Sequence, residues 1–91
     1  MKGKHRKDWN GSDLLEAGEY AYLPGHGWHA CTPNGHLANL SMHDCSFFDG
    51  VLTVSPSIKV SGHKIENDVR VSDDVVELWH GYLEHGVWRE C

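Results

Sequence analysis

The sequence predicts a mainly β fold, a small antiparallel sheet or open barrel of about six or seven short strands. Short apolar runs alternate with polar residues at a period of two, and turns rich in glycine separate them. Helical periodicity is absent after Gly18. These observations leave room for only one short helical turn, near the amino terminus.

The chain is long enough for one domain. It has 91 residues, of which 40% are hydrophobic, enough for one small core. No apolar run reaches the length of a membrane span, and the polar amino terminus shows no signal peptide. The three cysteines cannot all pair within one chain, and reduced thiols fit a cytoplasmic location.

The first ten residues differ in charge from the rest of the chain. Four of the first seven residues are basic, whereas the remainder holds four Lys/Arg and thirteen Asp/Glu. We expect residues 1–10 to form a flexible basic arm and residues 11–91 to form the β-rich domain. Because an acidic body repels phosphate, nucleic acid is not an expected partner.

The elements after the arm follow from local signals. Residues 12–18 resemble one helical turn, because Asp13 and Glu16 are spaced as in a capping box and Gly18 is a common helix end. Residues 20–23 and 28–31 are predicted to be short strands. Residues 61–74 are polar and are expected to form a surface excursion with one weak strand at 69–71. Residues 75–83 and 87–90 are predicted to pair through a turn at His85 and Gly86.

The clearest hairpin joins residues 43–48 to residues 51–55 through Asp49 and Gly50, a pair typical of a two-residue type I′ turn. This turn sets a register in which one row should face the core. That row holds Phe47, Leu52, Cys45 and Val54. Asp44 and Ser55 then lie opposite each other on the second face, and Ser57 joins them if the strand continues through Pro56.

Ser57 and His80 are the candidate catalytic pair. A histidine and a serine held on strands are the minimum parts for nucleophilic catalysis, although most serines only form turns and most strand histidines only bond a carbonyl. His80 would take the Ser57 hydroxyl proton, and backbone N–H groups near Ser57 or Gly62 would hold the oxyanion. Gly81 would leave space for the substrate backbone.

Two sets of cysteines and histidines suggest other chemistry. Thiolates and imidazoles together suit tetrahedral zinc, but their spacing here matches no standard zinc motif, and we expect no cofactor. Cys91 would face His80 across the last hairpin, although a residue at a chain end is a poor place to fix a nucleophile. The zinc candidates are Cys31, His36, His43 and Cys45.

Several segments, in the same order along residues 27–91, resemble small phage and prophage proteins and, through them, the BubE-like family of bacterial ubiquitin-like operons. The resemblance rests on the segment from Trp28 to Gly35, on residues 52–58 with their Pro-Ser-Ile pattern, and on residues 79–88 with their His-x-x-Leu-x-x-Gly pattern. The residues that carry it also include Asn39, Leu40 and His43.

The resemblance implies a serine peptidase that acts on a ubiquitin-like or other peptide substrate, in a host bacterial cytoplasm if the chain is encoded by a phage. Ser57 matches the serine of the Pro-Ser-Ile segment, and His80 matches the histidine that begins the closing strand. The sequence departs from the family pattern in two places. The turn after the Trp28 strand has one cysteine, and the 61–74 excursion is longer.

A third group should orient His80. Glu84 lies about 13 Å along the strand, too far for contact. Asp44 is the preferred candidate because its register places it across from Ser55. His43 is an alternative implied by the resemblance, and a dyad without a carboxylate is a further one.

The competing class is a non-enzymatic binding module encoded by a phage against a host defence. In that reading Trp79, Tyr82 and Trp88 are candidates for interface hot spots, although core packing is expected for at least two of them. A third reading is a structural β domain stabilised by zinc. The oligomeric state is not predicted by any of the three.

Overall fold

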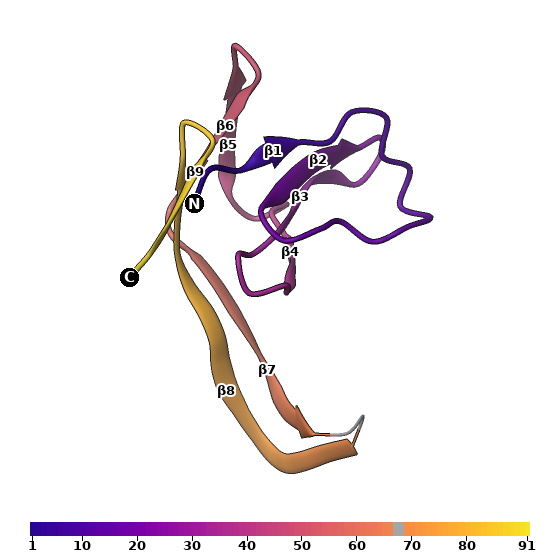
Figure 1. The fold of residues 1–91 in the computed structure, drawn as a ribbon, viewed down its shortest axis with the longest axis vertical. Helices are drawn as coiled ribbons and strands as arrows, with labels where there is room; N and C mark the ends of the chain where they lie inside the picture. The colour runs from indigo at the N-terminus through magenta and orange to yellow at the C-terminus, as the bar shows by residue number, and fades with distance from the viewer. Residues whose placement is uncertain (67–68) are drawn as a thin grey trace.

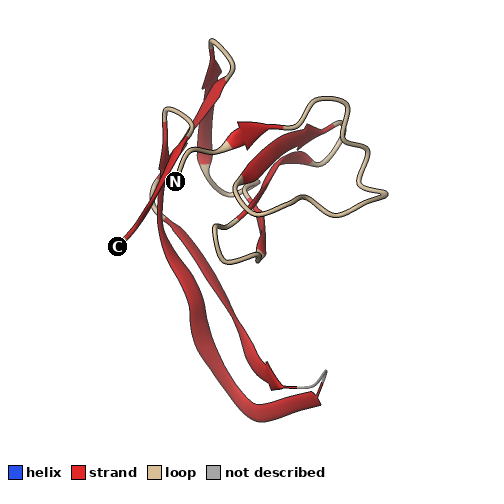
Figure 2. Ribbon diagram, viewed as in Figure 1, coloured by secondary structure: helices blue, strands red, loops and turns tan. Residues whose placement is uncertain are grey.

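The computed structural model describes residues 1–66 and 69–91. Within them it is built of strands without a helix, as a rounded body from which one long hairpin projects (Figures 1 and 2). The prediction of a mainly β domain is confirmed. The strands in order are β1 (Lys4–His5), β2 (Glu19–Leu23), β3 (Gly27–Cys31), β4 (Leu37–Asn39), β5 (Asp44–Phe48), β6 (Val51–Ser55), β7 (Ile58–Glu66), β8 (Val69–Glu84) and β9 (Val87–Glu90).

The strands form three small sheets. The first has the order β1-β2-β3-β4, the second is the β5–β6 hairpin, and the third has the order β7-β8-β9. All neighbouring pairs are antiparallel except β1 and β2, which are parallel. The molecule measures 42 × 30 × 23 Å along its principal axes, and the β7–β8 hairpin accounts for its elongated shape (Figure 1).

Residues 1–10, expected as a free basic arm, lie against the body. Lys4 and His5 pair with Glu19 and Tyr20, and the amino group of Met1 donates a hydrogen bond to the Trp88 carbonyl oxygen over 3.1 Å. The Trp9 side chain is buried and packs in a small core with Leu15. The basic charge pattern did not reveal this because many of the contacts are made by the backbone and by the rings of His5 and Trp9.

Residues 12–18 form bends and one turn in place of the expected helical turn. The Glu19 carboxylate accepts a hydrogen bond from the Glu16 backbone N–H over 2.7 Å, and Glu19 N–H bonds the Glu16 carbonyl over 2.9 Å. The side chain expected to cap a helix, Asp13, instead forms an ion pair with Arg6. Tertiary contacts therefore override a weak local signal.

The β5–β6 hairpin has the predicted register in full, with Asp44 opposite Ser55, Cys45 opposite Val54 and Phe48 opposite Val51. The predicted core row is only partly buried. Leu52 and Val54 are 0% and 2% exposed, whereas Phe47 is 42% exposed. Phe47 lies near the tip of the hairpin, beyond the main core, and packs on the rings of His5 and Trp28.

Residues 61–74, expected as an irregular excursion, instead continue the two long strands. Ile65 pairs with Arg70 and Glu66 pairs with Val69, with residues 67–68 outside the described part. A polar composition did not predict this pairing, since backbone hydrogen bonds between strands need no apolar side chains. The β8–β9 register matches the prediction, with Glu84 opposite Val87 and Tyr82 opposite Arg89.

The main core fills the space between the sheets. One face of the β7-β8-β9 sheet supplies a large share of it, and Trp79 and Trp88 meet there edge to face at 5.4 Å between centroids. The expectation that at least two of the three aromatic residues near the carboxyl end pack in the core is confirmed, because both tryptophans are buried. The buried side chains of this face are Ile58, Trp79, Leu83 and Trp88.

Candidate active site

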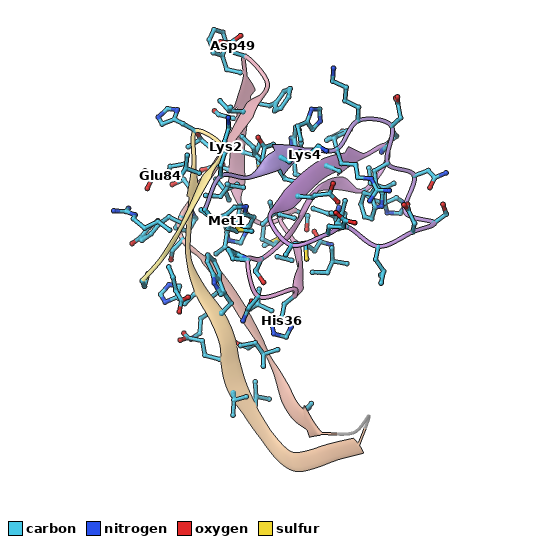
Figure 3. The ribbon with its side chains drawn as sticks, in the orientation of Figure 1. Met1, Lys2, Lys4, His36, Asp49 and Glu84 are labelled. Atoms are coloured by element: carbon cyan, nitrogen blue, oxygen red, sulfur yellow. The ribbon has the colours of Figure 1, made fainter. Side chains whose placement is uncertain are left out.

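Ser57 and His80 meet on the outer face of the β7-β8-β9 sheet. Ser57 immediately precedes β7, and His80 lies in β8 opposite Lys59. Ser57 Oγ is 2.9 Å from His80 Nε2. This serine and this histidine therefore converge in the structure, as predicted. Glu84, four residues along β8 from His80, points away from the body in Figure 3.

Around Ser57 and His80 the two faces of the sheet follow from the alternation of side chains along its strands. Ile58, Trp79 and Leu83 point into the core, so their neighbours Ser57, Lys59 and His80 point out. The His80 side chain is 34% exposed. The candidate nucleophile and base are therefore accessible to solvent and are held on strands anchored by the core beneath.

Glu77 also lies beside His80, three residues before it in the same strand. Its Oε1 is 3.7 Å from His80 Nδ1. In a regular strand, residues three apart lie on opposite faces. A β-bulge removes this restriction, because Val60 pairs with Trp79 but Ser61 pairs with Glu77, which leaves Leu78 as an extra residue in β8.

The bulge explains why sequence reasoning missed Glu77. Ser61 shares the face of Lys59, so Glu77, opposite Ser61, shares the face of His80. Period-two alternation assigns Glu77 to the core face, and no sequence signal marks Leu78 as the bulged residue. Asn34 Nδ2 donates a hydrogen bond to the Leu78 carbonyl oxygen over 2.9 Å, which ties the bulge to the loop before β4.

The contacts of the imidazole define its tautomer. A carboxylate beside Nδ1 favours the proton on that nitrogen, so we assign Nε2 as the acceptor of the Ser57 hydroxyl hydrogen. The Glu77 contact is longer than a hydrogen bond and acts through charge. Lys59 Nζ is also 4.0 Å from Glu77 Oε1, so the carboxylate lies between an ammonium group and the imidazole.

His43 contacts the backbone of Ser57 and not His80. Its Nε2 is 3.2 Å from the Ser57 carbonyl oxygen, and a carbonyl can only accept, so Nε2–H donates. The same tautomer leaves Nδ1 without a proton, and Nδ1 is buried with no partner among the described residues. His43, which the resemblance offered as an alternative orienting group for His80, thus contacts the main chain of Ser57.

Asp44 stands in the predicted register opposite Ser55. Its side chain is exposed, and no described hydrogen bond or ion pair joins it to His80. The acidic neighbour of His80 in the described part of the chain is Glu77, so the preference for Asp44 as the third group does not match the geometry. The predicted register placed Asp44 opposite Ser55 correctly, in the β5–β6 sheet, but His80 lies in the β7-β8-β9 sheet.

The two glycines assigned to the site have other surroundings. A Cβ on Gly81 would lie 2.3 Å from the Arg89 carbonyl oxygen and 2.4 Å from the Trp79 ring. Gly81 therefore makes room for core packing, and it lies on the opposite face from His80. Gly62 lies five strand residues from Ser57, about 16 Å at the usual rise, which is too far to hold an oxyanion at Ser57.

The three cysteines lie at separate places in the fold, Cys31 and Cys45 at least partly buried and Cys91 exposed. Burial raises the pKa values of the Cys31 and Cys45 thiols, and neighbouring Glu19 and Asp44 respectively raise them further. In the described ranges, no group of three or more His, Cys, Asp or Glu side chains could hold a metal ion. Cys91 lies beside His80 as the register predicted, and its backbone N–H donates to the His80 carbonyl oxygen over 3.0 Å.

The outer face that carries Ser57 and His80 is partly exposed to solvent. One cavity, with a volume of about 340 Å³, lies on the first sheet, and none of its lining residues comes from β7, β8 or β9. Within the residues the structure describes, no helix has the length and apolar character needed to cross a membrane. Comparison with protein-family models, curated proteins and solved structures finds no match for the chain.

Proposed function

We propose that the protein is a serine hydrolase in which Ser57 is the nucleophile and His80 is the general base. The observation that carries the proposal is the 2.9 Å contact between Ser57 Oγ and His80 Nε2 on a solvent-accessible surface. This distance lies within the range for proton transfer from a nucleophile to its base. Residues 23 positions apart are brought together here by the strand register.

Glu77 serves as the orienting carboxylate. It favours the tautomer in which Nε2 can accept the serine proton, and it would stabilise the imidazolium that forms. Its exposed position means that water competes for its charge, so its contribution should be smaller than that of a buried triad aspartate. His43 holds the Ser57 carbonyl and acts as a positioning residue.

The reaction would be acyl transfer. Ser57 Oγ attacks the carbonyl carbon of an ester or amide as its proton passes to His80 Nε2. His80 then gives this proton to the leaving alcohol or amine, which departs and leaves an acyl-serine. A water molecule then attacks the acyl-serine and gives a proton to His80, which passes it to Ser57 Oγ as the bond from Oγ to the acyl group breaks and the carboxylic acid leaves. A solvent-accessible pair on the face of a sheet favours a substrate segment that can lie across strands, such as an exposed peptide of a ubiquitin-like protein.

A fluorophosphonate probe tests this proposal because it phosphonylates only activated serines. Wild-type protein should be labelled, and Ser57→Ala and His80→Ala should not be. Ser61→Ala is the matched serine control, since Ser61 is exposed on the same face of β7. His85→Asn is the histidine control, because His85 is exposed in a turn with φ of 50°, a conformation that asparagine tolerates.

The result that overturns the proposal is an unlabelled wild-type protein whose fold is verified by circular dichroism. Equal labelling of wild type and Ser57→Ala would also overturn it. If labelling depends on Ser57 but not on His80, the serine is reactive without the proposed base and the mechanism is wrong.

A binding module is the second candidate, and one observation favours it. The β7–β8 hairpin projects from the body (Figure 1), and Val75 and Val76 in it are 67% and 37% exposed. Exposed apolar side chains on a projecting hairpin are typical of protein contact surfaces. If the protein is a binding module, replacing both Val75 and Val76 with aspartate should abolish partner binding. If it is a hydrolase, the same double variant should leave fluorophosphonate labelling unchanged.

A further inference from the structure

The bulge in β8 leaves one residue outside the ladder between β7 and β8. Along β8 the pairs with β7 step from Trp79 directly to Glu77, so Leu78 has no paired residue. The backbone groups of a bulged residue take no part in the regular ladder and need other partners. The Leu78 carbonyl oxygen finds its partner in a loop of the first sheet, where Asn34 Nδ2 donates a hydrogen bond to it over 2.9 Å.

The loop between β3 and β4 holds the Asn34 side chain in one direction. The Thr32 hydroxyl donates to Asn34 Oδ1 over 2.6 Å, which leaves the Nδ2 end of the amide for Leu78. The same hydroxyl accepts a hydrogen bond from His36 N–H over 3.0 Å, and Thr32 N–H donates to the His36 carbonyl oxygen over 2.8 Å. Thr32 is 0% exposed and directly follows β3. A buried and fully bonded threonine therefore orients the amide.

A regular register is the alternative to the bulge. Without an extra residue, Leu78 would pair with Ser61 and turn to the outer face, and Glu77 would turn away from it. In the structure the Leu78 side chain lies against Gly62, where an added Cβ would come within 3.0 Å of it. Glu77 then lies on the outer face, with Oε1 3.7 Å from His80 Nδ1. The direction of the carboxylate thus depends on whether the bulge is kept.

We propose that Asn34 is a positioning residue of the site, which keeps the bulge and so holds Glu77 beside His80. Its effect on the reaction rests on the proposed function. Asn34 acts through the Leu78 carbonyl and not on the reacting atoms. The site is thereby built by two sheets, since the β7-β8-β9 sheet carries the reacting groups and a loop of the first sheet sets the direction of the carboxylate.

Asn34→Ala removes the amide without adding a charge, and the rate of fluorophosphonate labelling tests its role. The rate should fall about fivefold, the change that corresponds to one net hydrogen bond. In a protein that already carries Glu77→Gln, Asn34→Ala should cause no further loss, because the effects of residues that act through one another do not add. Asn39→Ala is the matched control and should leave the rate unchanged, since Asn39 is also exposed but bonds the Ser41 backbone N–H.

The ring nitrogens of His80 give a second readout, which a general loss of stability would not move. In nitrogen NMR spectra of the neutral imidazole, the wild-type chain should show a protonated Nδ1 and an unprotonated Nε2. Asn34→Ala should shift the ring toward a mixture of the two tautomers, as Glu77→Gln should. This measurement needs no enzymatic activity.

An unchanged His80 tautomer in Asn34→Ala overturns the inference. A labelling rate that Asn34→Ala leaves unchanged, or lowers equally with and without Glu77, overturns it as well. If the folded wild-type protein is not labelled at all, the hydrolase proposal fails, and the tautomer alone then decides whether Asn34 positions Glu77.

Discussion

One face of β8 near His80 packs in the core, whereas the other carries polar side chains at the surface. On the inner face Trp79, Gly81 and Leu83 are fixed by close packing. On the outer face Glu77, His80 and Tyr82 make contacts with other side chains at the surface. A strand whose one side is locked in a core offers its other side as a rigid platform, which is the condition for a preorganised site. The comparison predicts that inner-face changes alter stability and outer-face changes alter reactivity.

The largest expected effect is on the inner face. Trp88→Ala removes a 2% exposed ring and its hydrogen bond to the Gly18 carbonyl oxygen. We expect a loss of about 3–5 kcal/mol in the free energy of unfolding, measured by urea denaturation. A loss below about 1 kcal/mol would contradict the core as described.

Gly81→Ala should be the next most severe. The new Cβ would meet the Arg89 backbone oxygen at 2.3 Å, and a backbone atom cannot move aside cheaply. We expect a loss of about 1–3 kcal/mol or more, measured in the same way. Gly62→Ala is the matched control in the neighbouring strand, since its Cβ would meet only the flexible tip of Leu78 at 3.0 Å. Equal losses for the two variants would show that the register near Gly81 is wrong.

Glu77→Gln tests the outer face. The substitution removes the charge beside His80 Nδ1, and we expect fluorophosphonate labelling to slow about tenfold, less than the full contribution of a general base. The free energy of unfolding should change by less than about 1 kcal/mol because both groups are exposed. Glu84→Gln is the control on the same face, where it breaks the 2.9 Å ion pair with Arg89. Equal slowing by both variants would remove the case for Glu77.

The smallest expected effect lies on neither face of β8 but at β1. Burial lowers the pKa of His5 from its usual 6.5, and Lys7 lowers it further. The unfolded chain therefore binds this proton more readily than the folded protein does, and stability should decline as the pH falls below about 6.5. His5→Phe, which keeps an aromatic ring against Phe47, should flatten that decline in thermal melts at different pH values. An unchanged pH profile would show that His5 is not a source of it.

The sequence predicted the parts of the fold that depend on turns. Asp49-Gly50 and His85-Gly86 each set a hairpin register, and both registers are confirmed. Core packing was also expected for at least two of Trp79, Tyr82 and Trp88, and both tryptophans are buried. The arm at residues 1–10 and the turn at 12–18 were not predictable, because Trp9 and Glu19 make contacts between segments that no local pattern encodes.

Part of the candidate site was also predicted from the sequence, namely Ser57 and His80. Ser57 and His80, the residues predicted as a pair, lie in contact, although no predicted register placed one beside the other. Glu77 was not predicted because the bulge at Leu78 shifts the alternation of side chains by one residue and so places Glu77 on the outer face. His43 was an alternative for the group that orients His80, but its ring contacts the Ser57 carbonyl oxygen. Register can be read from a turn, whereas a bulge depends on contacts such as Asn34 with Leu78.

The most direct measurement is to locate the fluorophosphonate adduct by mass spectrometry of the labelled, proteolysed protein. Our account predicts one adduct, on the peptide that carries Ser57, at a rate that falls when His80 is replaced. An adduct on a different serine of the folded protein, or a Ser57 adduct formed equally fast without the imidazole, would contradict it.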